Sequence, residues 1–125
     1  MSYVRLNPKA SIGSITFASG WEAYASYDKN PIIEENGIVN CSIRCKPTQT
    51  MSRGGWRTVG SITPANTGVY TTTYALASVY VNSAYSVVEA RIVNGTLEIY
   101  PSVDLPSGTE CAFNFAYTTI SQPHT

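Results

Sequence analysis

The chain has 125 residues, of which 43% are hydrophobic and only 13% are charged, with eight basic and eight acidic side chains. This length predicts one domain with its own core, and the zero net charge argues against a broad nucleic-acid surface. No stretch is long and apolar enough to cross a membrane, and residues 1–8 lack the apolar segment of a signal peptide. We therefore expect neither a nucleic-acid partner nor membrane insertion.

The first elements follow a lead-in of residues 1–10. The pattern of residues 11–17 predicts a short strand, and we expect Trp21 to plug the core behind it. Two Asn-Gly pairs then indicate hairpins, because Asn and Gly both tolerate the positive φ of tight turns. No segment shows a competing helical period.

The first hairpin surrounds Asn36 and Gly37. A two-residue turn would place Glu34 opposite Val39 and mix polar with apolar side chains on one face. A three-residue loop, residues 35–37, places Ile33 opposite Val39 instead, and we predict this register. In the returning strand, the inward side chains are then Val39, Cys41, Ile43 and Cys45, and the outward ones are Asn40, Ser42 and Arg44.

The second hairpin turns at residues 94–95. A two-residue turn pairs Ile92 with Leu97 and Arg91 with Glu98, so every pair agrees in polarity. A loop over residues 101–108 leads to the last strand, whose inner face carries Cys111, Phe113, Phe115 and Tyr117. The whole pattern, about eight strands with turn signals every 8 to 12 residues or so, predicts an all-β fold over residues 11–120. We expect an antiparallel β-barrel or a jelly-roll-like sandwich, followed by a polar tail, residues 121–125.

Three cysteines leave several pairings open. Cys41 and Cys45 would lie roughly 13 Å apart along one strand, too far for a disulfide. Cys111 could pair with either, but three buried, reduced thiols are the simpler interpretation. The only histidine is His124 in the tail, so we expect no metal site and no cofactor.

Catalysis has little support in this sequence. A nucleophile relay needs a base within reach, and the tail histidine is a poor candidate. Asp28, Asp104 and Glu110 could meet as a glycosidase pair, but carboxylates on scattered loops are more often solvated surface groups. We expect the protein not to be an enzyme.

A ligand site is predicted near Trp56, since residues 44–57 hold four of the eight cations and no acid. The ring of Trp56 can stack on a sugar while Arg53 and Arg57 hold hydroxyl, carboxylate or phosphate groups. The alternative is a solvated loop with Trp56 turned into the core. Tyr24, Tyr27 and Asp28 form a second candidate for ligand binding, with plain surface as its alternative.

Five segments in this order give the chain a family resemblance: residues 15–24, 36–41, 59–64, 90–99 and 113–117. The succession resembles the distal receptor-binding (head) domains of tail-fibre and baseplate proteins of phages that infect Gram-positive bacteria, and it spans about residues 11–120. The resemblance implies a homotrimeric head on the virion, at a tail tip, fibre or baseplate, assembled in the host cytoplasm beside other tail proteins. Such heads bind cell-wall polysaccharide or another surface saccharide of the host. Two alternatives remain open, a structural trimerisation knob of a tail fibre and a monomeric carbohydrate-binding module.

Overall fold

The computed structural model describes residues 11–24, 32–35, 37–63 and 72–118. Within these ranges the regular structure is all β. The strands are β1 (Ser11–Ile12), β2 (Ser14–Phe17), β3 (Trp21–Ala23), β4 (Ile32–Glu35), β5 (Ile38–Pro47), β6 (Arg57–Thr63), β7 (Thr72–Val81), β8 (Ala84–Val93), β9 (Thr96–Tyr100) and β10 (Cys111–Thr118).

All ten strands belong to one antiparallel sheet that closes on itself. Its order is β1-β4-β5-β10-β7-β8-β9-β6-β2, with β3 paired separately to β5. Only Gly13 separates β1 from β2, so one chain segment pairs with β4 through β1 and with β6 through β2. Counted as one bent strand, this segment completes an eight-stranded barrel. The expected all-β barrel of about eight strands is confirmed.

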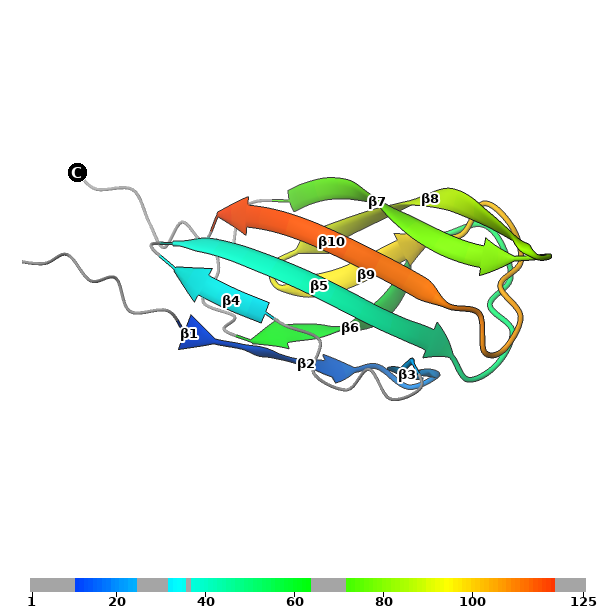
Figure 1. The fold of residues 1–125 in the computed structure, drawn as a ribbon, viewed down its shortest axis with the longest axis horizontal. Helices are drawn as coiled ribbons and strands as arrows, with labels where there is room; N and C mark the ends of the chain where they lie inside the picture. The colour runs from blue at the N-terminus through cyan, green and yellow to red at the C-terminus, as the bar shows by residue number, and fades with distance from the viewer. Residues whose placement is uncertain (1–10, 25–31, 36, 64–71, 119–125) are drawn as a thin grey trace, which may run out of the picture.

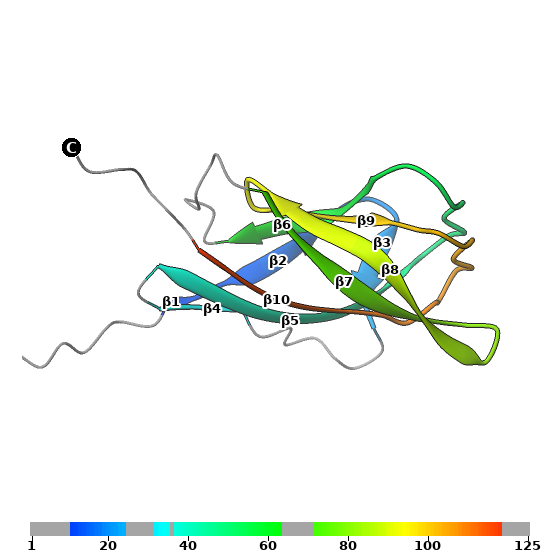
Figure 2. The same ribbon diagram turned by 90° about the horizontal axis from the view of Figure 1, so that it is seen from above.

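The barrel is flattened into two layers. In Figures 1 and 2, β4, β5 and β10 form one layer, β2, β6 and β9 form the other, and β7 and β8 join them along one side. The start of β1 and the end of β10 lie at the same end of the molecule, opposite the turn between β7 and β8.

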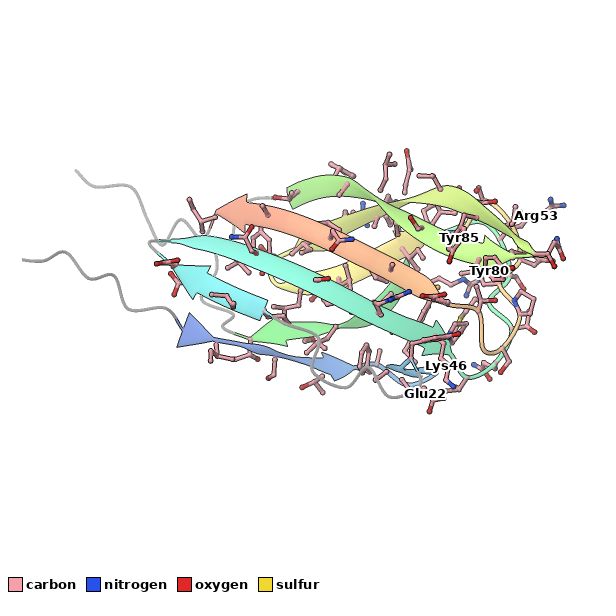
Figure 3. The ribbon with its side chains drawn as sticks, in the orientation of Figure 1. Glu22, Lys46, Arg53, Tyr80 and Tyr85 are labelled. Atoms are coloured by element: carbon pink, nitrogen blue, oxygen red, sulfur yellow. The ribbon has the colours of Figure 1, made fainter. Side chains whose placement is uncertain are left out.

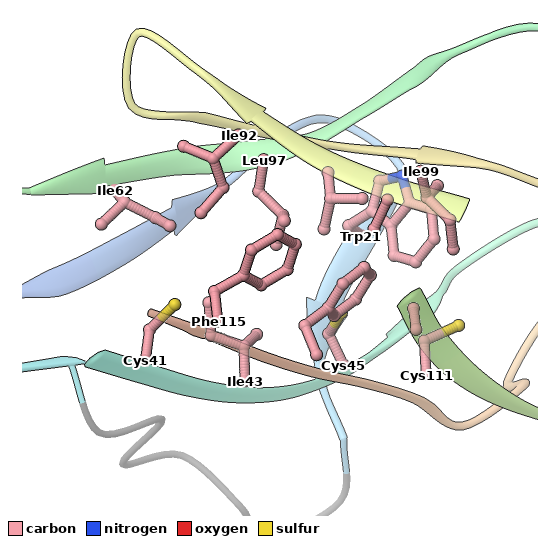
Figure 4. Packing of buried hydrophobic residues seen from close by; sticks show 14 of the residues in the cluster. Trp21, Cys41, Ile43, Cys45, Ile62, Ile92, Leu97, Ile99, Cys111 and Phe115 are labelled. Carbon is pink, nitrogen blue, oxygen red and sulfur yellow. The ribbon is translucent and has the colours of Figure 1, made fainter. Parts of the chain in front are cut away.

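The core fills the space between the two layers (Figure 4). Trp21 is 5% exposed there, as expected of a core plug. Alternate side chains of β5 and β10 point inward, because successive residues of a strand face opposite sides of the sheet. All the residues predicted to face inward are buried: Val39, Cys41, Ile43, Cys45, Cys111, Phe113, Phe115 and Tyr117.

The two predicted hairpins have different outcomes. The second has the expected register, with Ile92 opposite Leu97 and Arg91 opposite Glu98. The first does not, because Glu34, and not Ile33, lies opposite Val39. The predicted three-residue loop is therefore wrong. The mismatch in polarity is relieved locally, since the Glu34 carboxylate accepts a hydrogen bond of 2.9 Å from the backbone N–H of Gly37.

A further hairpin, between β7 and β8, was not predicted from the sequence. It pairs all ten residues of β7 with all ten of β8. Its turn consists of Asn82 and Ser83, with φ values of 54° and 63°. An Asn-Ser pair is a weaker signal than Asn-Gly, because Ser pays a steric cost for positive φ that Gly does not.

The three cysteines are buried and free, as expected. Cys111 lies directly opposite Cys45 on the neighbouring strand, and both thiols face the core. Burial raises the pKa of Cys41 to about 11 and that of Cys111 to about 12, and it also raises the pKa of Cys45. These thiols are therefore packing groups and poor nucleophiles.

Candidate functional site

Trp56 lies on the outside of the barrel, immediately before β6, and is half-buried by other aromatic side chains. Its ring centroid is 6.2 Å from that of Tyr74 and 5.4 Å from that of Tyr100, the latter in an edge-to-face arrangement. The guanidinium carbon of Arg91 lies 3.9 Å from the centroid of the indole ring. This distance is typical of a cation–π contact.

Strand register brings these partners together. Tyr74 on β7 lies opposite Arg91 on β8, and Arg91 lies opposite Glu98 on β9. The Nε of Arg91 donates a hydrogen bond of 2.5 Å to Oε1 of Glu98, and this bond raises the already high pKa of Arg91. A fixed cation therefore covers the indole of Trp56. The alternative in which Trp56 turns into the core is wrong, because Trp56 is not part of the core cluster. The predicted ligand site at Trp56 stays a prediction, with Arg91 already over the ring.

The two arginines predicted to flank Trp56 have separate surroundings. Arg57 donates from Nε and Nη2 to the carbonyl oxygen of Ser52, at 3.1 and 2.9 Å, and so ties the preceding loop to β6. The backbone N–H of Arg53 donates to Oδ1 of Asp104 at 2.9 Å. The Arg53 residue is exposed, at the end of the molecule that also carries Tyr80 and Tyr85 (Figure 3).

The cation on Trp56 is thus Arg91, which sequence reasoning did not select. The pairing of Arg91 with Glu98 was predicted, but not its stacking on a tryptophan that lies 35 positions earlier in the chain. Of the second predicted ligand site, Tyr27 and Asp28 lie outside the described residues, so the site stays a prediction. Tyr24 is half-buried, and Nζ of Lys46 lies 5.9 Å from its ring centroid.

The carboxylates considered for catalysis have structural partners. Glu110 forms an ion pair with Arg44, and Asp104 accepts the hydrogen bond from Arg53. Asp28, the third, is outside the described ranges. Among the residues that the structure describes, no group of three His, Cys, Asp or Glu side chains is placed to hold a metal ion. The same residues include no helix long and apolar enough to span a membrane.

A shallow groove runs across the outer face of β4, β5 and β10. Its volume is about 460 Å³, and its lining consists of Ile33, Asn40, Cys41, Ser42, Asn114, Phe115 and Ala116. Cys41 and Phe115 contribute from the buried side of the sheet. The remaining five residues are outward positions of three adjacent strands.

The register sets the chemistry of this groove. Ser42 lies opposite Asn114, and Asn40 has Ile33 on one side and Ala116 on the other. The lining therefore combines two amides and one hydroxyl with small apolar surfaces, and it carries no charge. Amides and hydroxyls both donate and accept hydrogen bonds. Such a surface suits an uncharged ligand rich in hydroxyl groups.

The groove was not predicted as a site. Strand alternation predicts that Asn40, Ser42 and Asn114 point outward. It does not predict that β5 and β10 are neighbours in the sheet. These strands are separated by more than 60 residues and meet only in the folded sheet.

Comparison with known proteins supports the fold. No protein-family model matches the chain, and no curated protein sequence matches it. Among solved structures, the chain is similar to the crystal structure of the head domain of phage bIL170, one of the receptor-binding domains of lactococcal phages. The TM-score is 0.71 at 12% sequence identity, over 90% of this chain and all of the other. The likeness is one of fold, and it agrees with the head-domain resemblance predicted from the sequence.

Proposed function

We propose that this chain is the receptor-binding head of a phage tail and that it recognises a saccharide on the surface of a Gram-positive host. The observation that carries the proposal is the fold shared with a phage head domain over nine-tenths of the chain. In this proposal the head is a homotrimer on a tail tip, fibre or baseplate, in contact with other tail proteins. It binds its ligand without catalysis.

We assign the saccharide to the groove across β4, β5 and β10. Ligand sites are concave and combine apolar surface with a few well-placed polar groups, as this groove does. Among the described residues, Asn40, Ser42 and Asn114 have no side-chain hydrogen-bond partner, and we assign their amides and hydroxyl to the ligand. They stand on adjacent strands of a barrel, which holds them in fixed positions.

Trp56 is less suited to the same task. Arg91 lies over its ring, and Tyr74 and Tyr100 pack beside it. The predicted site of Trp56, Arg53 and Arg57 therefore serves as the alternative location on the same head. The exposed Arg53 would favour an anionic substituent there.

Affinity would come from repetition of the site. A shallow, uncharged groove offers a few hydrogen bonds worth about 0.5–1.5 kcal/mol each, so single sites would be weak. Linking several heads makes the later binding events intramolecular and raises the avidity by factors of roughly 10² to 10⁴.

The test is binding of fluorescently labelled protein to a panel of Gram-positive cells, before and after chemical removal of surface polysaccharide. We expect strain-specific binding that disappears on stripping. Ser42→Ala and Asn114→Ala should each weaken it about tenfold, the effect of roughly one lost hydrogen bond. Ser61→Ala, an exposed serine on β6 away from the groove, is the matched control.

Other outcomes distinguish the alternatives. If both groove variants bind like the wild type and Trp56→Ala does not, the ligand lies at the tryptophan. A folded trimer that binds no cell would indicate a structural knob. A monomer that binds the purified polymer would indicate a carbohydrate-binding module.

A further inference from the structure

The outer surface of β7, β8 and the end of β9 holds six of the nine large exposed hydrophobic side chains among the described residues. Outward side chains of β7, β8 and the end of β9 leave six large hydrophobic residues between 37% and 67% exposed: Tyr74, Leu76, Tyr80, Tyr85, Val87 and Tyr100. We call this surface the β7–β8 outer face. The other large exposed hydrophobic residues, on β1, β4 and β5, are Ile12, Ile33 and Ile38.

Strand register makes the face continuous. Tyr80 lies opposite Tyr85, with ring centroids 4.8 Å apart, at the distal end of the hairpin. Val87 lies opposite Ser78, and Leu76 lies opposite Glu89, which is itself opposite Tyr100. Hydrophobic side chains therefore recur along both strands, with Ser78, Glu89 and Arg91 as their cross-strand neighbours.

The inner faces of the same strands are also apolar. Ala77, Val79, Val88, Ala90 and Ile92 all belong to the core. Strands that are apolar on both faces are typical of strands covered on both faces. By contrast, β5 alternates between a buried apolar face and an outer face that bears Asn40, Ser42, Arg44 and Lys46. Among the described strands, β7 and β8 carry most of the large hydrophobic side chains that point outward, interspersed with Ser78, Glu89 and Arg91.

The size of the face fits association with another protein. Aromatic side chains bury about 150–250 Å² each, so the six residues at their observed exposures amount to roughly 600 Å². That is at the upper limit for the largest apolar patch of an ordinary monomer, and close to the roughly 800 Å² that each partner contributes to a standard interface.

Charge points in the same direction. Arg91 and Glu98 neutralise each other within the face, and Glu89 is the other charged side chain on it. Tyrosine, tryptophan and arginine are the residues enriched at interface centres, and the face contains four tyrosines beside Trp56 and Arg91. The face therefore offers no group of like charges that could bind a polyanion or another strongly charged partner.

We infer that the β7–β8 outer face is the surface through which copies of this chain associate. The inference deepens the proposed function, which requires a homotrimer, by naming the contact. Three hairpins converging on a three-fold axis would bury the six hydrophobic residues of each copy. The groove across β4, β5 and β10 lies on other strands and stays open to ligand.

The experiment is sedimentation of the full chain at micromolar concentrations without saccharide. We expect the wild type to have three times the 13.5 kDa mass of one chain. Leu76→Glu and Val87→Lys, at side chains 64% and 58% exposed, should both reduce the mass to a single chain while the circular dichroism spectrum stays unchanged. Ile38→Glu, at an isoleucine 45% exposed on β5, is the control and should remain oligomeric.

A second measurement does not depend on disruptive variants. Ser78→Cys places a thiol in the middle of the face, whereas the three native thiols are buried. A short bis-maleimide should cross-link Ser78→Cys into covalent oligomers but leave Ser61→Cys on β6 as single chains.

A monomeric wild type, an oligomer that survives both charge substitutions, or equal cross-linking at positions 78 and 61 would overturn the inference. Because no saccharide is present, these outcomes do not test ligand recognition. A monomeric wild type would also contradict the homotrimer of the proposed function, whereas an oligomer that survives both charge substitutions would contradict this interface alone. Conversely, an oligomer that binds no cell leaves the interface standing and contradicts only the proposed receptor binding.

Discussion

At the scale of single residues, burial holds the cysteines in one protonation state. The thiols of Cys41 and Cys111 have their pKa raised from 9.0 to about 11 and about 12, because the core offers no solvation for a thiolate. The pKa of Cys45 is raised for the same reason, and Cys111, which lies opposite it, adds to this increase. The folded protein therefore keeps protons that the unfolded chain releases above pH 9.

This difference predicts alkaline destabilisation. Above pH 9 the unfolded state binds fewer protons than the native state, so the free energy of unfolding must fall as pH rises. Each thiol contributes a slope of up to about 1.4 kcal/mol per pH unit, until its folded pKa is reached. Urea unfolding at about pH 8 and about pH 10 measures the change. Below pH 9 the thiol contribution is fully present, so stability should be flat with respect to these groups.

Cys41→Ala provides the control for this prediction. The variant should be less stable at every pH, because it leaves a small cavity, but its stability should fall less steeply above pH 9. Equal unfolding free energies for the wild type at both pH values would contradict the assignment, as would rapid reaction of an aromatic disulfide reagent with the folded protein.

At the scale of elements, the three hairpins show what determines register. The second was predictable because polarity agrees at every pair on both faces, as at Arg91 and Glu98. The first was not, because the hydrogen bond from Gly37 to Glu34 stabilises a pair that polarity alone disfavours. Ile33 is consequently on the outer face, where it lines the groove. Cross-strand polarity is thus a weak guide next to a turn, where side chains can bond to the turn itself.

The β7–β8 turn offers a stabilising substitution. Ser83 has a φ of 63°, a left-handed conformation that costs a residue with a Cβ atom about 1–2 kcal/mol. Ser83→Gly removes that cost but increases the entropy of the unfolded chain, which offsets roughly 0.5–1 kcal/mol. We expect a net gain of about 0.5–1 kcal/mol in unfolding free energy, measured by urea denaturation.

Ser83→Val is the matched opposite, because a β-branched side chain is disfavoured at positive φ. It should lower stability by about 1 kcal/mol or more. A destabilised Ser83→Gly variant would show that the serine hydroxyl contributes to the turn. In that event the backbone conformation would not be the main cost at this position.

At the scale of the whole molecule, the barrel could be predicted from the sequence but its surfaces could not. Inward positions such as Val39 and Phe113 follow from alternation and were assigned correctly. Leu76 and Val87 obey the same alternation on the opposite face, and a sequence does not say which of two apolar faces is the core. The groove and the Trp56 cluster both depend on pairings between distant strands, which no local pattern encodes.

The barrel is closed by the short segment of β1 and β2, in which Gly13 is the residue between the two strands. The backbone N–H of Gly13 donates to the carbonyl of Ile32 at 2.7 Å, the last bond to β4 before the chain crosses to β6. Gly13→Pro removes this donor and leaves the carbonyl without it. We expect the free energy of unfolding to fall by about 1–2 kcal/mol, because the lost bond outweighs the stiffening of the unfolded chain.

Gly13→Ala separates the effect of losing this hydrogen bond from the effect of replacing glycine. Alanine keeps the N–H donor and also reduces the entropy of the unfolded chain. The structure gives Gly13 no positive φ, so alanine should match or slightly exceed the wild type in urea unfolding. Equal stability of the proline and alanine variants would mean that the bond to Ile32 adds nothing. Closure would then rest on the β2–β6 pairing alone, with β4 as a free edge.

A free edge beside the groove would loosen Ile33 and Asn40, so the proline variant should also lose saccharide binding if the groove is the site.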